Sequence, residues 1–152
     1  MQRMIKILFL CHGNICRSPM AEFILKKMVR DAGCEDRFEI ASAAVSREEI
    51  GNDIYPPARQ KLREENVPFD RRRAHLVTER EMRESDLVVI MDSSNERWLH
   101  RLFGDRYDSK IRYLMDFAGE RRDVSDPWYS GDFERTYQDV KTGCRALLDR
   151  LG

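Results

Sequence analysis

The sequence predicts an α/β domain with a parallel sheet that is covered by helices on both faces. Two observations predict this fold: short apolar runs alternate with segments of helical periodicity, and the 152 residues fit one domain spanning 1–152. In such a sheet the crossovers are right-handed and ligands bind beyond the carboxyl ends of the strands. The residues that follow the first strand are therefore the first candidates for a functional site.

Local signals place the individual elements. Apolar runs indicate buried strands, while proline, capping boxes and glycine indicate where helices begin and end. In chain order we expect a strand at 4–10, a helix from Pro19 to Gly33 with Glu22 in its first turn, a strand at 38–44, a helix at 57–65, helices that begin at the capping boxes Thr78/Glu81 and Ser93/Glu96, strands at 87–91 and 111–114, and a helix at 133–151 capped by Asp132.

Charge and cysteine content limit the possible partners. Lys plus Arg (27) equals Asp plus Glu (27), so no net field attracts the chain to nucleic acid or to an anionic membrane. The first apolar run is too short for a signal-peptide core or a membrane span, which favours a soluble cytoplasmic protein. The four cysteines have neither C-x-x-C nor zinc-finger spacing, so we expect reduced thiols, no metal site and no cofactor.

The residues after the first strand form a pattern that suits a phosphate dianion. Cys11 and Arg17 bracket five residues. The N–H groups of so tight a loop can point inward, while the following helix directs its positive end at the same place. The planar guanidinium of Arg17 can hold two phosphate oxygens at once. Such a loop binds phosphate without any net charge on the protein.

Cys11 is the candidate nucleophile in this loop, because positive surroundings favour its thiolate form. Ser18 can donate its hydroxyl to the thiolate, and Gly13 and Asn14 are the residue types that best tolerate the positive φ of an inward-turned loop. A lone cysteine is more commonly a small buried apolar residue, and Asn14 and Ser18 also suit an ordinary turn and helix cap. Their position between a strand and a Ser-Pro helix start favours the functional interpretation.

A second candidate segment lies within 115–132, the one long stretch without a predicted helix or strand, which marks it as functional or mobile. Asp126 can supply the proton that a leaving aryloxide or alkoxide needs, although Asp-Pro is also a common turn. Trp128 and Tyr129 can wall a pocket for a substrate ring, or they can dock the segment onto the sheet. The pair of aromatic residues favours an aromatic phosphate ester as the substrate.

These segments together carry a family resemblance. The loop at 11–19 (CHGNICRSP) and the segment at 126–129 (DPWY) resemble those of low-molecular-weight protein tyrosine phosphatases. The resemblance covers nearly the whole chain and includes residues 42–44, 51–52 and 91–95. The order and spacing of these segments are more specific than the loop alone.

The resemblance implies a four-stranded parallel sheet and hydrolysis of phosphotyrosine through a cysteinyl-phosphate. Cys11 would be the nucleophile, Arg17 the phosphate clamp, and Asp126 the general acid and then the base that activates water. The substrates would be phosphotyrosine-containing proteins, and a cognate tyrosine kinase is a candidate partner. The other implied site residues are His12, Gly13, Asn14, Ile15, Cys16 and Ser18 in the phosphate-binding loop, Ser42 as loop support, and Trp128, Tyr129 and Glu48 in the pocket wall.

Several positions keep two interpretations open. Cys16 matches the position of a second cysteine that can form a reversible disulfide with the nucleophile in the family, or it is a buried packing thiol. His12 stands where many relatives have a small or apolar residue, and Glu48 where an aromatic residue commonly walls the cleft. Glu48 can disfavour acidic phosphopeptides, or it is a solvated loop carboxylate. The arginines at 71–73 are expected to form a solvated surface, with peptide docking as the alternative.

Three other functions compete with phosphotyrosine hydrolysis. A thiol-dependent arsenate reductase needs additional resolving cysteines, and no cysteine lies between Cys34 and Cys144. A protein-arginine phosphatase carries Thr in place of Ile15, whose branched apolar side chain suits a phenyl ring better than a guanidinium. A non-catalytic phosphate-binding or redox-sensing module would have no use for both Arg17 and Asp126. Phosphotyrosine hydrolysis is therefore the favoured function.

Overall fold

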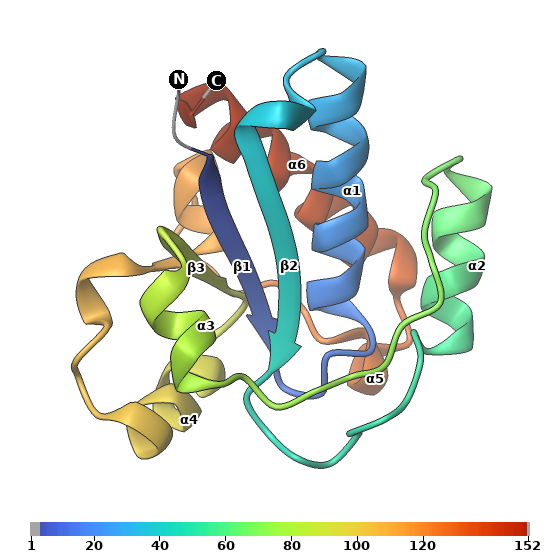
Figure 1. Cartoon of the computed structure of the whole chain (residues 1–152). Coiled ribbons are helices and arrows are strands. Elements are labelled where there is room, and N and C mark those ends of the chain that lie inside the picture. Colours follow the sequence, from blue (N-terminus) through green and yellow to red (C-terminus); the bar gives the residue numbers. More distant parts are fainter. Residues whose placement is uncertain (1–3, 152) are drawn as a thin grey trace.

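The computed structural model describes residues 4–151, and its centre is a four-stranded parallel sheet with the strand order β2-β1-β3-β4 (Figure 1). Helices cover both faces of the sheet, so the predicted α/β fold class is confirmed. The elements are β1 (Ile5–Cys11), α1 (Arg17–Asp31), η1 (Glu35–Arg37), β2 (Phe38–Ala44), α2 (Pro56–Glu64), α3 (Glu79–Glu84), β3 (Leu87–Ile90), α4 (Ser93–Phe103), η2 (Asp108–Lys110), β4 (Ile111–Tyr113), η3 (Leu114–Ala118), α5 (Pro127–Ser130) and α6 (Phe133–Leu151), where η denotes a 3-10 helix.

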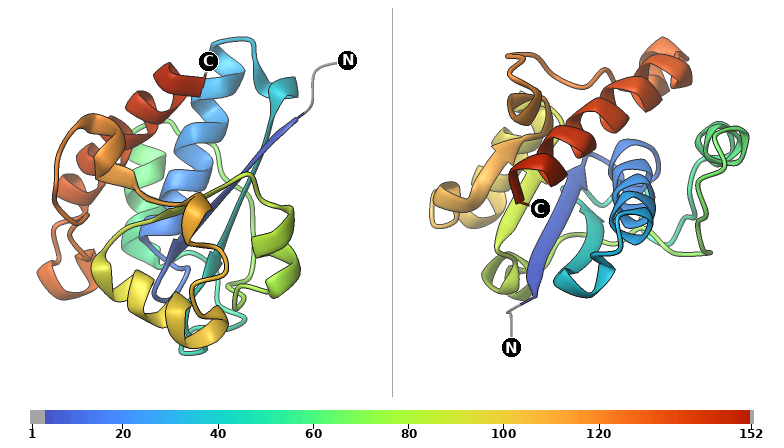
Figure 2. Two further views of the ribbon diagram at one scale, coloured as in Figure 1. Left: turned by 90° about the vertical axis from the view of Figure 1, so that its left-hand side faces the viewer. Right: turned by 90° about the horizontal axis from the view of Figure 1, so that it is seen from above.

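Alternate residues of β1 divide the core into two halves. Ile7, Phe9 and Cys11 belong to the cluster packed under α1 and α6, whereas Leu8 and Leu10 belong to the cluster under α3 and α4 (Figure 2). Successive side chains of a strand point to opposite faces, so a central strand with both faces covered is apolar at every position. Cys11 therefore reaches the site from the α1 side of the sheet.

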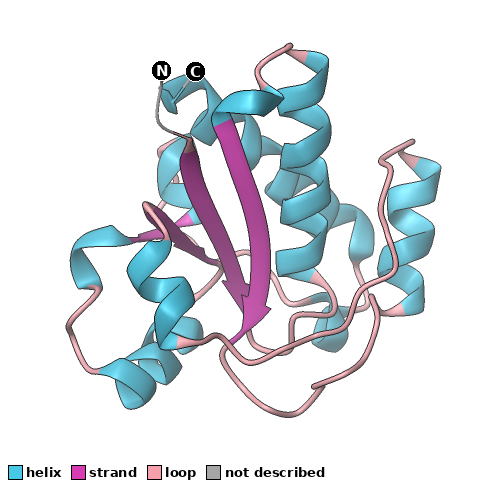
Figure 3. Ribbon diagram, viewed as in Figure 1, coloured by secondary structure: helices cyan, strands magenta, loops and turns pink. Residues whose placement is uncertain are grey.

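The carboxyl ends of the two central strands, β1 and β3, lie side by side at one end of the sheet. After β1 the chain forms β2 on one side of it, and it then returns to form β3 on the other side (Figure 3). Loops that follow such a reversal diverge and leave a crevice in which ligands bind. Cys11 is the last residue of β1, where it is paired with Ala44 of β2. The fold thus places the Cys11 side chain at this crevice.

Helix α1 begins at Arg17, two residues earlier than the predicted start at Pro19. Its cap residue, Cys16, makes no side-chain capping bond, and Ser18 lies inside the first turn instead of capping it. Glu22 was predicted to lie in the first turn, but with this earlier start it lies beyond that turn. The physical reason is that the N–H of Ser18 donates to Cys11 Sγ at 3.4 Å, so the loop takes the place of a side-chain cap.

Two further predictions need correction, while two predicted caps are confirmed. The side chain of Asp92, not Ser93, caps α4 by accepting the N–H of Asn95. The stretch 115–132 is not wholly irregular, since it contains most of η3 and all of α5. The Thr78/Glu81 capping box is present at α3, and Asp132 accepts an N–H of the first turn of α6 at 2.9 Å. Neighbouring polar residues offer alternative caps, and tertiary packing selects among them.

Helix α6 packs closely against η3 at Gly143, where an added Cβ would lie 2.4 Å from Cγ of Leu114. We expect Gly143→Ala to lower the free energy of unfolding, because overpacking costs about 1–3 kcal/mol against a gain in helix propensity of at most about 1 kcal/mol. Urea unfolding measures the change, with Thr142→Ala at the exposed neighbouring position as the control. An unchanged stability would show that Leu114 moves aside at no cost.

Candidate active site

The loop at residues 11–17 turns its carbonyl groups outward, where four of them accept hydrogen bonds from the surrounding protein. None of the peptide bonds in residues 4–151 is cis, so each N–H points away from the preceding carbonyl. The N–H groups of residues 12, 13, 15 and 16 therefore face the inside of the loop and form an anion cradle. The outward pairs are Cys11 with Val45 N–H (3.1 Å), His12 with Ser46 N–H (3.1 Å), Ile15 with Tyr55 N–H (2.9 Å) and Asn14 with the Arg72 guanidinium.

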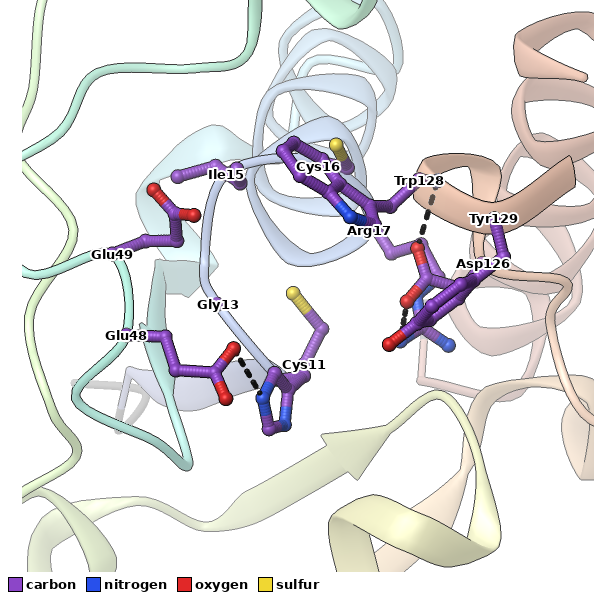
Figure 4. A pocket seen from close by; sticks show the side chains of 11 residues that line it. Cys11, Gly13, Ile15, Cys16, Arg17, Glu48, Glu49, Asp126, Trp128 and Tyr129 are labelled. Carbon is purple, nitrogen blue, oxygen red and sulfur yellow. Dashed lines mark hydrogen bonds and ion pairs between the residues drawn. The ribbon is translucent and has the colours of Figure 1, made fainter. Parts of the chain in front are cut away.

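The Sγ atom of Cys11 lies within this loop and faces the pocket (Figure 4). The hydroxyl oxygen of Ser18 lies 3.0 Å from the sulfur, and the N–H of Ser18 donates to it. The side chain of Cys11 is almost fully buried. The predicted contact between Ser18 and Cys11 is therefore present, and two donors are available to a thiolate.

Asn14 and Gly13 fill different structural needs in the loop. Asn14 has a φ of 59°, so the expectation of a left-handed residue is confirmed for it. Gly13 does not share this conformation, and that part of the expectation is wrong. A Cβ on Gly13 would lie 3.1 Å from Cγ of Glu49, so the glycine leaves room for the pocket wall to approach the loop closely.

A buried polar cluster supports the loop from behind. The amide Nδ2 of Asn14 donates to the hydroxyls of Ser18 at 2.8 Å and Ser42 at 3.0 Å. Ser42 in turn donates to a carboxylate oxygen of Glu22 at 2.6 Å. Ser42 thus contacts the loop as predicted, whereas Glu22 carries a role that its helical position did not indicate.

The guanidinium of Arg17 is held by groups from two other segments. Its Nη1 donates to Asp92 at 2.6 Å and to the carbonyl of Val124 at 3.0 Å, and its Nη2 donates to Asp126 at 3.4 Å. Burial acts to lower the pKa of Arg17, but the charges of Cys11, Asp92 and Asp126 outweigh it and raise the pKa above its ordinary value. Arg17 is therefore a fixed cation at the base of the pocket.

The pocket above the loop has two chemically different walls (Figure 4). Asp126, Trp128 and Tyr129 form one wall, and the two aromatic side chains are 52% and 86% exposed, so they do not dock onto the sheet. Glu48 and Glu49 form the opposite wall. The three predicted wall residues, Trp128, Tyr129 and Glu48, all line the pocket, and Glu49 is an additional carboxylate that the sequence did not single out.

His12 and Glu48, the two departures from the family pattern, are partners of each other. Their Nε2 and Oε2 atoms lie 3.0 Å apart at the rim of the pocket. The ring of His12 also packs edge-on against Trp98 of α4, with centroids 5.4 Å apart. The side chain of Glu48 is 66% exposed, so it is a solvated loop carboxylate that is also paired with His12.

The four cysteines are free thiols, and they differ in environment. Burial, together with the charges of Cys11 and Asp126, raises the pKa of Cys16 far above its ordinary value. Burial alone does the same for Cys144. Both remain protonated at neutral pH. Within residues 4–151 no group of three or more His, Cys, Asp or Glu side chains is arranged to hold a metal ion.

A thiol facing an anion cradle, with an arginine and a carboxylate in the same pocket, defines a cysteine-containing site that fits a phosphate group. Comparisons of sequence agree with this class. The family model for low molecular weight phosphotyrosine protein phosphatases matches residues 6–152. The low molecular weight protein-tyrosine-phosphatase YfkJ of Bacillus subtilis is 38% identical over 147 residues, covering 95% of this chain and 94% of that protein. The human low molecular weight phosphotyrosine protein phosphatase is 33% identical over 149 residues, with coverage of 95% and 94%.

Solved structures give the same result. The crystal structure of YfkJ from Bacillus subtilis matches with a TM-score of 0.93 at 37% identity, covering 97% of this chain and 94% of that one. The crystal structure of a Drosophila arginine phosphatase matches with a TM-score of 0.87 at 26% identity, covering 97% and 98%. The chain belongs to the low molecular weight phosphotyrosine protein phosphatase family. The predicted resemblance and the prediction of a hydrolase are confirmed.

Iodoacetate should carboxymethylate Cys11 and leave Cys16 and Cys144 unmodified at pH 7, because alkylation requires the thiolate and burial keeps these two thiols protonated. Inorganic phosphate should protect Cys11, since it would occupy the cradle. Peptide mapping by mass spectrometry measures modification at each position, and urea-unfolded protein, in which all the cysteines react, is the control. Modification of Cys16 as fast as that of Cys11 would contradict the assignment.

Proposed function

We propose that this protein, as one phosphatase domain spanning 1–152, hydrolyses phosphotyrosine in proteins through a cysteinyl-phosphate intermediate. One observation carries the proposal: Cys11 Sγ, the inward N–H groups of its loop and the carboxylate of Asp126 share a single pocket. The cradle supplies electrostatic stabilisation of the transferring phosphoryl group, which is commonly the largest contribution to catalysis.

In the first step the phosphate dianion binds in the cradle and against Arg17. Both hydrogens of Nη1 are used by Asp92 and Val124, so the edge formed by Nε and Nη2 is left to hold two phosphate oxygens. The thiolate of Cys11 attacks phosphorus, the S–P bond forms, and the P–O bond to the tyrosine oxygen breaks.

Asp126 is the proposed general acid for the leaving oxygen. Its Oδ1 accepts the N–H of Trp128 at 3.0 Å, which leaves Oδ2, on the side of Arg17, to carry and deliver the proton. In the second step Asp126 accepts a proton from water while the water oxygen attacks phosphorus. The S–P bond breaks, and the hydroxyl of Ser18 stabilises the departing thiolate of Cys11.

The side chains around the cradle favour an aromatic substrate. Ile15 lines the pocket with a branched apolar surface, and Trp128 and Tyr129 add exposed rings beside Asp126. Phosphoarginine is the second candidate, because the carboxylates of Glu48 and Glu49 attract a guanidinium and an arginine phosphatase shares this fold. The side chain of Ile15 offers a guanidinium no hydrogen-bond acceptor and suits a phenyl ring better, which favours tyrosine.

Hydrolysis of phosphotyrosine, phosphoserine and phosphoarginine by the purified protein tests this assignment. We expect phosphotyrosine to be the best substrate in the presence of EDTA, and we expect Cys11→Ser to abolish turnover. Cys34→Ser, which changes a cysteine outside the pocket, is the matched control and should retain full activity. Faster hydrolysis of phosphoarginine would move the assignment to the second candidate, and turnover by Cys11→Ser would overturn the mechanism.

Asp126→Ala should slow phosphotyrosine hydrolysis by about 10²–10⁴-fold, the usual contribution of a general acid. An aryl phosphate with a good leaving group should be slowed much less, because its aryloxide departs without a proton. Single-turnover measurements of the release of the phenol show directly how much the variant slows each of the two substrates. If both substrates are slowed equally, Asp126 is a structural residue of α5 and not the acid.

Glu48 and Glu49 should make the enzyme prefer phosphotyrosyl peptides with basic flanking residues over acidic ones. Charges at the rim of an interface change association more than chemistry, so we expect a change in kcat/KM that weakens with added salt. Replacing both residues with glutamine should remove most of the preference, while Glu35→Gln, at the opposite end of the sheet, should not. An undiminished preference in the double variant would assign both carboxylates to loop structure.

Three other expectations stay predictions. A Cys11–Cys16 disulfide, formed when the Cys16 thiol attacks a peroxide-derived Cys11 sulfenic acid and releases water, would make the activity redox-regulated. A cytoplasmic location and a cognate tyrosine kinase are likewise proposals. No helix within residues 4–151 is both long and apolar enough to cross a membrane.

A further inference from the structure

Arg72 differs from its two neighbours in the arginine run. Arg71 and Arg73 are exposed, whereas Arg72 is half-buried against the outer side of the phosphate-binding loop. Its Nη2 donates to both the main-chain carbonyl and the side-chain Oδ1 of Asn14, and its Nη1 donates to the carbonyl of Asn52 at 3.3 Å. The expectation of a solvated surface is therefore wrong for Arg72.

Main-chain hydrogen bonds hold Arg72 in this position. The N–H of Ala74 donates to the carbonyl of Asn52 at 2.7 Å, and the carbonyl of Ala74 accepts the N–H of Gly51 at 2.8 Å. The N–H of Arg72 itself donates to a carboxylate oxygen of Asp53 at 3.4 Å. The segment before α3 is thus fixed against the segment before α2, and the guanidinium reaches the loop from an ordered backbone.

The contact fixes the peptide group between Asn14 and Ile15. Asn14 is fully buried, so its carbonyl has no water to bind, and a buried carbonyl without a donor would cost about 1–3 kcal/mol. With the carbonyl bound to Arg72, the trans peptide directs the N–H of Ile15 to the opposite side, into the cradle. Loss of the guanidinium would remove the reason for this orientation.

The positive charge of Arg72 also favours anion binding by the N–H of Ile15. Burial lowers the pKa of Arg72, while the charges of Glu22, Asp53 and Cys11 oppose that effect, and a guanidinium remains protonated in proteins. A cation on the carbonyl side of a peptide group polarises it and strengthens its N–H as a donor. The donor so strengthened is the one that faces the anion.

We propose that Arg72 is a positioning residue for the transferred phosphate group. It acts through Asn14, by orienting and polarising the N–H of Ile15, and it does not touch the substrate. The inference deepens the proposed function and rests on it, because it assigns the bound anion to the cradle around Cys11.

Calorimetric binding of orthovanadate and inorganic phosphate to wild type, Arg72→Met and Arg72→Lys tests the proposal. We expect Arg72→Met to weaken both anions by about 10–100-fold, the usual effect of losing a hydrogen bond to a charged group. Arg72→Lys keeps the charge but loses the planar fork, so its affinity should be intermediate. Arg71→Met and Arg73→Met are matched controls from the same run and should bind as wild type does.

Kinetics and thermal unfolding of the same variants separate positioning from simple stabilisation. A positioning role raises KM for phosphotyrosine and lowers kcat/KM, with partial rescue in Arg72→Lys. A purely structural role lowers the unfolding temperature while the folded variant keeps wild-type anion affinity, and that result would overturn the proposal. Equal weakening in Arg73→Met would overturn it too.

Two outcomes need separate interpretation. If Arg72→Met does not fold, Arg72→Lys carries the comparison, and wild-type affinity in that variant would refute the need for a guanidinium. Anion binding is measured without turnover, so a wild type that binds vanadate but does not hydrolyse phosphotyrosine would count against the proposed function and leave the role of Arg72 intact.

Discussion

The orientation of the peptide groups in residues 11–16 is the constraint on which the rest of the site depends. A cradle with inward N–H groups requires an external donor for each outward carbonyl, because buried main-chain groups must be paired. The protein supplies these donors from Val45 and Ser46 after β2, from Tyr55 before α2 and from Arg72 before α3. Segments far apart in sequence therefore converge on one short loop, and the sheet serves to hold them in register.

The site attracts an anion although the chain carries no net charge. Arg17 is buried and faces two partly exposed carboxylates, and a buried cation needs such partners. The contact to Asp92 (2.6 Å) is much shorter than the contact to Asp126 (3.4 Å), which identifies Asp92 as the partner that orients the guanidinium. Asp92 neutralises Arg17, so the pull on a phosphate dianion comes chiefly from the N–H groups and the start of α1.

Local sequence patterns predicted the strands, most helices and the Cys11 loop, because each depends on neighbouring residues. The partners of that loop were not predictable in the same way. Asp92 meets Arg17 across 75 positions, and nothing in its own segment signals the contact. The sequence does not distinguish Arg72 from its two arginine neighbours. Only the hydrogen bonds between residues 51–52 and residue 74 determine which of the three side chains reaches the loop. The early start of α1 was missed because sequence rules assume a side-chain cap where this helix has a thiol-bearing loop.

The charged residues at the two ends of the buried cluster fix the direction of every hydrogen bond between them. Arg72 can only donate, so the Oδ1 of Asn14 must face it and Nδ2 must face the serines. A carboxylate can only accept, so Ser42 must donate to Glu22 and accept from Asn14. Ser18 also accepts from Asn14, which leaves its single proton for the sulfur 3.0 Å away. A flipped amide would set donor against donor at Arg72, so the hydroxyl of Ser18 is held in the orientation that stabilises a thiolate.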